Sequence, residues 1–167
     1  MNSKFIVSWF IVAVVILGGL WYVGKNNVSV TSLATTPDQS SQLVTDFVLY
    51  DFGTISMRDG LVKKEFLLTN STESEVTLTG LYTSCMCTAA NVVQIDGEKI
   101  GPFGMQGMDS FAPRLREALA PGESRSIEVV YNPNAHGPAG VGPVDRFVTV
   151  QDSTGVSVFE IKAMVTP

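Results

Sequence analysis

The fold is decided by residues 61–81, LVKKEFLLTNSTESEVTLTGL. In residues 61–69, Val62, Phe66 and Leu68 fall on one face of an extended chain. Lys63 and Glu65 fall on the other. Residues 75–81 repeat the alternation with valine and leucine against threonine, and the turn-forming cluster NSTES separates the two segments. A period of two indicates β-strands with one buried face, so this stretch predicts two strands joined by a turn.

The same pattern continues on both sides of this stretch. Further alternating or apolar β-type segments occupy residues 47–52, 124–131, 144–151 and 156–165. Residues 92–100 read as a hairpin, because Asp96-Gly97 between two apolar runs favours a type I′ turn. Residues 101–123 are rich in glycine and proline, with one short helix predicted at 113–119. About seven short strands without a long helical period predict a mainly β protein, a small antiparallel β-sandwich.

Four short signatures occur in a fixed order along this region. They are YDFGTI at residues 50–55, EFLLTN at 65–70, TSCMCT at 83–88 and APGE at 120–123. In this order they resemble the bacterial domain-of-unknown-function family 1573, over roughly residues 46–165. The resemblance implies a single immunoglobulin-like sandwich and no established activity. Met86 stands where the family pattern has a glycine, and the stretch 94–118 is longer than the family pattern leads us to expect.

The N-terminal segment has a different character. Residues 5–23, FIVSWFIVAVVILGGLWYV, contain no charged residue and are long enough for a helix to cross the hydrocarbon core of a bilayer. We therefore expect residues 1–25 to be a single-pass membrane anchor rather than a cleaved signal, whose apolar region is usually shorter. Residues 26–45 are polar and predict a flexible tether, which leaves residues 46–167 for the sandwich domain.

Charge and orientation limit the partners. The chain is 45% hydrophobic and only 16% charged, against about 25% charged in typical domains, and the anchor accounts for much of this difference. Residues 26–167 hold nine basic and sixteen acidic residues, a net charge of −7, which disfavours nucleic acid as a partner. A single N-terminal anchor normally exports the chain on its C-terminal side, so we expect a cytoplasmic N-terminus and an extracytoplasmic domain in the cell membrane.

The residues most able to carry chemistry are the only two cysteines, Cys85 and Cys87. One interpretation is structural: the pair shapes a turn, either as small buried residues or as a local disulfide that constrains little of the unfolded chain. A second is thiol redox chemistry, which needs a basic neighbour. His136, the only histidine, lies in a glycine- and proline-rich loop where a histidine is more often solvated.

The third interpretation is a metal site. Two thiolates are soft ligands of the kind that select Cu(I), and Met86, Met105 and Met108 could help. Zinc is less favoured, because a structural zinc site uses four Cys or His ligands. Apart from this possible copper, the sequence indicates no cofactor.

The sequence therefore favours binding over catalysis. No paired carboxylates in a cleft motif, no Gly-x-Ser-x-Gly and no phosphate loop occur in it. We expect a membrane-anchored, extracytoplasmic immunoglobulin-like module that binds or scaffolds an envelope protein, for example by pairing with a strand along a sheet edge. The alternative is a copper-binding or thiol-redox protein that uses the Cys85-Met86-Cys87 loop.

Overall fold

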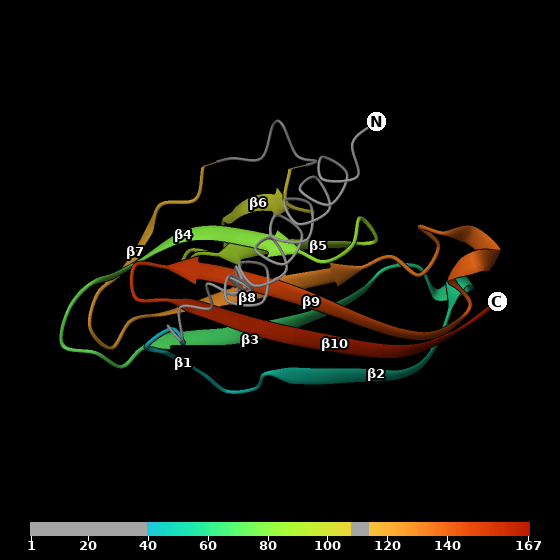
Figure 1. The fold of residues 1–167 in the computed structure, drawn as a ribbon, viewed down its shortest axis with the longest axis horizontal. Helices are drawn as coiled ribbons and strands as arrows, with labels where there is room; N and C mark the ends of the chain where they lie inside the picture. The colour runs from blue at the N-terminus through green and yellow to red at the C-terminus, as the bar shows by residue number, and fades with distance from the viewer. Residues whose placement is uncertain (1–39, 108–113) are drawn as a thin grey trace, which may run out of the picture. The chain divides into compact units, whose positions relative to one another are not determined.

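Two β-sheets stacked face to face make up the computed structural model, which describes residues 40–107 and 114–167 (Figure 1). The first sheet has the strand order β1-β3-β8-β5-β6, formed by Leu43–Thr45, Val62–Asn70, Ser124–Tyr131, Thr88–Val93 and Lys99–Phe103. The second has the order β2-β10-β9-β4-β7, formed by Leu49–Ser56, Val156–Thr166, Gly142–Asp152, Val76–Thr83 and Glu117–Leu119. Two short 3-10 helices, η1 (Met57–Asp59) and η2 (Gly137–Gly140), lie in the connections.

The mainly β two-sheet sandwich confirms the central prediction. Strands β3 and β4 come from the two halves of residues 61–81, but each joins a different sheet. One part of the fold class was wrong: β2 pairs with β10 in parallel, whereas the other pairings within the named strands are antiparallel. The chain passes through η1 from β2 in one sheet to β3 in the other, so β2 forms no hairpin with the next strand and pairs instead with the C-terminal strand β10.

The core lies between the sheets and follows the alternation in the sequence. Phe66 from β3 stacks on Phe159 from β10 with ring centroids 4.7 Å apart, and both side chains are fully buried. Leu68, Ile127 and Leu78 are likewise buried at the inward positions of β3, β8 and β4. Burial of these large apolar side chains is the dominant favourable term in folding, and it fixes which face of each strand points inward.

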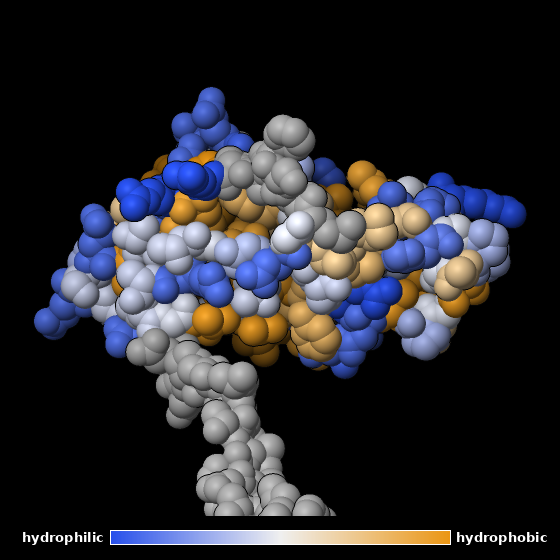
Figure 2. Space-filling view, turned by 45° about the horizontal axis from the view of Figure 1, so that its top comes forward, coloured by the Kyte–Doolittle hydropathy of each residue, from blue (hydrophilic) through white to orange (hydrophobic). Residues whose placement is uncertain are grey.

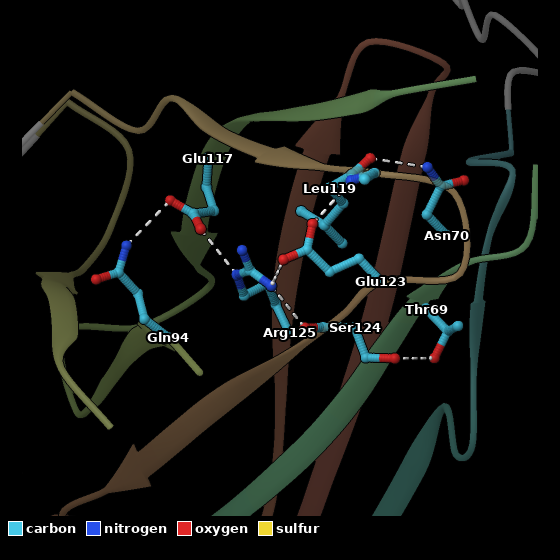
Figure 3. A network of polar contacts seen from close by, with 9 residues as sticks. Thr69, Asn70, Gln94, Glu117, Leu119, Glu123, Ser124 and Arg125 are labelled. Atoms are coloured by element: carbon cyan, nitrogen blue, oxygen red, sulfur yellow. Dashed lines mark hydrogen bonds and ion pairs between the residues drawn. The ribbon is translucent and has the colours of Figure 1, made fainter. Parts of the chain in front are cut away.

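A polar network closes one side of the sandwich (Figure 3). Arg125 occupies an inward position of β8, and its Nε donates to Glu117 Oε1 of β7 in the other sheet at 2.7 Å. Its Nη1 lies 2.7 Å from Glu123 Oε1 and donates to the Ser124 carbonyl. Gln94 donates to the second oxygen of Glu117 at 3.2 Å. The buried guanidinium of Arg125 therefore links β8 of one sheet to β7 of the other through an ion pair.

Three segment boundaries differ from the expectations. The strand expected at 47–52 continues through Gly53, which has a positive φ of 68° and donates its N–H to Asp51. β1 lies inside the segment expected as tether, and Leu43 is buried in the core. Residues 117–119 of the expected short helix form β7, because Leu119 gains full burial by pairing with β4.

The predicted anchor lies outside the described residues. Within residues 40–107 and 114–167, no helix is long and apolar enough to cross a membrane. The predicted anchor at residues 1–25 therefore stays a prediction.

Candidate functional site

The cysteine loop, residues 84–87, connects β4 of one sheet to β5 of the other at one end of the sandwich. Thr83 holds its start, because its hydroxyl lies 3.1 Å from the Cys85 carbonyl and 3.0 Å from the Thr88 carbonyl. The Thr88 N–H also donates to the Cys85 carbonyl, and the Asn132 N–H donates to the Cys87 carbonyl. Backbone hydrogen bonds thus hold the loop against β8.

The two cysteines differ in exposure. In the structure they are joined as a disulfide, with Cα atoms 5.3 Å apart. Cys85 is half-buried, whereas Cys87 is only 2% exposed and belongs to the core. The ring spans three residues, so by the loop-entropy relation it contributes only about 1–2 kcal/mol to folding. A reagent from solvent therefore meets the sulfur of Cys85 before that of Cys87.

His136 reaches the loop from the connection between β8 and β9. Its Nε2 lies 3.3 Å from Cys85 Sγ, although the histidine is exposed and precedes η2 by one residue. The histidine is exposed, as the sequence predicts, but the structure also places its ring against a sulfur, which the sequence does not indicate. The ligand atoms of Cys85, Cys87 and His136 all lie within 4.8 Å of one another.

Arg146 approaches the other sulfur. It occupies position 146 of β9, in phase with the inward Val144 and Val148, and its Nε donates to Cys87 Sγ at 3.2 Å. Its Nη1 donates to the Asp145 carbonyl at 2.7 Å, which fixes the guanidinium. Sequence reasoning missed Arg146, because the pairing of β4 with β9 brings together residues 59 positions apart.

Two of the three candidate methionines flank the loop. Met86 is 68% exposed, and Met105 forms an isolated β-bridge with Thr83. Both methionines line a shallow hollow of about 290 Å³ together with Phe103. Met108 lies outside the described residues. For metal binding, the residues that could supply ligands are therefore Cys85, Cys87 and His136, with the methionines beside them, but sulfurs joined in a disulfide offer no thiolate.

A second feature with binding capacity is the edge strand β2. It ends its sheet, and Leu49 and Tyr50 are 45% and 37% exposed. Lys64 Nζ lies 4.7 Å from the centre of the Tyr50 ring and 5.5 Å from that of Phe47. Elsewhere on the surface, Figure 2 shows hydrophobic residues on the displayed face in several patches separated by hydrophilic ones.

Solved structures with a similar fold are known. A protein of unknown function from Porphyromonas gingivalis W83 matches at TM-score 0.53 and 12% identity, over 78% of this chain and 51% of its own. This chain thus spans about half the length of that protein, and the likeness concerns the fold alone. The secreted serine protease VesC from Vibrio cholerae matches at TM-score 0.47 and 17% identity, over 78% of this chain and 25% of its own. The ASH/PapD-like domain of human CEP192 matches at TM-score 0.47 and 13% identity, over 83% and 95%.

Sequence comparison adds no relative. No protein-family model matches the chain, and no curated protein matches it. The resemblance to domain-of-unknown-function family 1573 is therefore not confirmed, and the case for function rests on the cysteine loop and on strand β2.

Proposed function

We propose that this protein is a single-pass membrane protein that presents an immunoglobulin-like sandwich outside the cytoplasm and binds an extended segment of an envelope protein. It acts through binding, and β2 is the strand that pairs with the partner. The apolar residues 5–23, the polar stretch after them and the acidic domain support the anchored, exported arrangement.

The observation that carries the binding proposal is the difference between β2 and the other edge strands. β1 and β7 are three residues long, and β6 has five residues including Pro102. β2 has eight residues, no proline and two exposed apolar side chains at its start. Natural sheets usually shorten, charge or cover their edges, so an edge strand of this length with exposed apolar side chains at its start is a surface for strand addition.

The backbone of β2 tells which residue faces a partner. Glu160 of β10 donates its N–H to the Val48 carbonyl at 2.7 Å. Because successive residues of a strand point their N–H and C=O groups to opposite sides, Leu49 directs its groups away from β10. Gly53 interrupts the regular strand, since the register with β10 shifts between Lys162 and Met164. Residues 49–51 are thus the segment in regular register before this shift.

The anchor is tested by removing it. We expect the full chain, expressed in bacteria, to stay in the membrane pellet after alkaline extraction, and a chain lacking residues 1–25 to lose this attachment. Protease added to spheroplasts should digest the domain of the full chain, because we place it outside the cytoplasm. Resistance to that protease in intact spheroplasts, with digestion after lysis, would contradict the proposed orientation.

Partner binding is tested at Leu49 with Ile95 as the matched position. Ile95 is an apolar residue of the β5–β6 turn and is 79% exposed. We expect a photoreactive residue at 49, and not at 95, to crosslink a specific envelope protein in cells. With that protein purified, Leu49→Pro should weaken binding by about tenfold or more, because proline removes the outward N–H and its ring blocks the edge.

The binding test needs a control for folding and a control for position. Thermal unfolding of Leu49→Pro shows whether the fold survives, and Leu49→Lys serves in its place if the proline variant is unfolded. Ile95→Lys should bind like the wild type. If positions 49 and 95 crosslink the same proteins, or if both lysine variants bind equally well, β2 is not the binding edge.

A further inference from the structure

The two sulfurs of the cysteine loop sit in different surroundings. Cys85 is half-buried and has the exposed His136 ring 3.3 Å away. Cys87 is buried and receives a hydrogen bond from Arg146, whose side chain is fixed by the Asp145 carbonyl. One sulfur is thus open to attack from solvent, and the other is placed against a permanent positive charge.

This asymmetry matches what thiol–disulfide exchange requires. The sulfur that is attacked must be reachable along the line of the S–S bond, and the sulfur that leaves must accept the electron pair as a thiolate. A guanidinium that donates a hydrogen bond to the leaving sulfur stabilises that thiolate. We propose that Cys85–Cys87 is a thiol–disulfide exchange site for protein dithiols, with Cys85 as the attacked sulfur and Cys87 as the leaving sulfur. This activity goes beyond the proposed binding function and does not depend on β2.

The proposed thiol–disulfide exchange takes place in two displacement steps. First, a partner thiol gives its proton to His136 Nε2, and the partner sulfur attacks Cys85 Sγ. The S–S bond breaks, its electron pair goes to Cys87 Sγ beside Arg146, and a mixed disulfide joins the partner to Cys85. Second, the other partner thiol loses its proton to solvent and its sulfur attacks the partner sulfur of the mixed disulfide. Cys85 then leaves as a thiolate.

The electrons and protons end on the two cysteines. Cys85 takes the proton held by His136, and Cys87 takes one from solvent. The partner dithiol has become a disulfide, and the Cys85–Cys87 disulfide has become a dithiol, with two electrons and two protons transferred. Every step is reversible, so the direction depends on which dithiol is the stronger reductant.

The same contacts argue against a metal as the occupant. Arg146 directs an N–H at Cys87 Sγ, and its positive charge beside that sulfur repels a cation. His136 and the two sulfurs give three ligands, one short of a closed zinc site. Retention of Cu(I) by the reduced form would therefore oppose the proposal.

The test uses the full chain purified in detergent without reductant, with reduced glutathione as the probe. Opening of the disulfide is followed by alkylation and mass spectrometry after quenching with acid. We expect glutathione to be trapped on Cys85 and not on Cys87. We also expect opening to be on the order of tenfold faster than in an oxidised peptide of residues 83–89, which has the same ring without Arg146 and His136.

Arg146→Gln should slow opening by about tenfold, and Arg146→Lys should recover part of the rate, because it restores the charge without the planar guanidinium. Arg58→Gln is the matched control, since Arg58 is an exposed arginine of η1, and it should open at the wild-type rate. Thermal unfolding monitors the fold of each variant. If Arg146→Gln is unfolded, the site of glutathione attachment in the wild type decides the question.

Three results would overturn the proposal. These are glutathione attached mainly to Cys87, folded Arg146→Gln opening as fast as the wild type, or two free thiols in the purified protein that retain Cu(I) and form no disulfide after its removal.

Discussion

Replacing Arg125 by methionine is expected to lower the free energy of unfolding by about 2–3 kcal/mol, because the substitution leaves carboxylates without their cation. Arg125 is 8% exposed and Glu117 is 12% exposed, and their ion pair of 2.7 Å joins β8 of one sheet to β7 of the other. Removal of one partner of a buried ion pair typically destabilises by about 3–5 kcal/mol. The loss expected for Arg125→Met is smaller than this general range because the second carboxylate, Glu123, is 26% exposed and can be solvated by water.

Lowering the pH should reduce the free energy of unfolding that Arg125 contributes. The backbone N–H of Ala120 and then the side chain of Arg125 hold the pKa of Glu123 below its ordinary 4.5. A carboxyl group whose pKa is lowered in the folded state contributes stability above its ordinary pKa and loses it as the pH falls through the folded value. Below about pH 4.5 the wild type should therefore lose stability faster than Arg125→Met, and the difference between them should narrow.

Urea unfolding at pH 7 and at pH 3.5 measures both effects. Arg58→Met controls for the general loss of one positive charge and should change stability by less than about 0.5 kcal/mol. The double variant Arg125→Met with Glu117→Gln should be more stable than the sum of the single changes predicts, since it removes the uncompensated charge. Additive single effects would show that Arg125 and Glu117 are not coupled.

Strand periodicity predicted most of this fold for a physical reason. Each inward residue of β3, such as Phe66, alternates with an exposed one, and one buried face is enough to produce a period of two. The edge strands were harder to place. β1 and β7 have three residues each, too few for periodicity to show, and their positions depend on tertiary pairing with β3 and β4. The parallel placement of β2 depends on how the chain crosses between sheets, which local pattern does not encode.

The candidate site likewise has residues that the sequence indicated and residues that it did not. The Cys85-Met86-Cys87 loop is visible in the sequence, because its residues are adjacent and their chemistry is distinctive. His136 is exposed, as expected, but its proximity to Cys85 was not predicted, since nothing local indicates that the β8–β9 connection folds back onto the β4–β5 connection. Arg146 was not identified from the sequence. An inward arginine in an otherwise alternating strand is the one clue, because a charged side chain at a core position needs a buried partner.

The largest loss of stability is expected from Phe66→Ala, at about 3–5 kcal/mol, the range for truncating a buried aromatic residue. Phe66 is fully buried, and its ring stacks on Phe159 at an angle of 14°. Phe66 belongs to β3 in one sheet and Phe159 to β10 in the other, so this contact packs the two sheets against each other. Phe147→Ala is the matched control, because Phe147 on β9 is 43% exposed, and we expect it to lose less than about 1 kcal/mol.

The same substitution also tests how the binding edge depends on the core. β2 contacts the rest of its sheet through β10, whose inward Phe159 loses its stacking partner in Phe66→Ala. Hydrogen exchange should therefore show faster exchange in β10 and its neighbour β2 than in β4 and β7, which lie two and three places from β10 in the sheet order. Phe66→Leu should restore most of the stability, because it refills much of the volume. If Phe66→Ala and Phe147→Ala destabilise equally, the stacked pair does not stabilise the core more than an exposed aromatic side chain does.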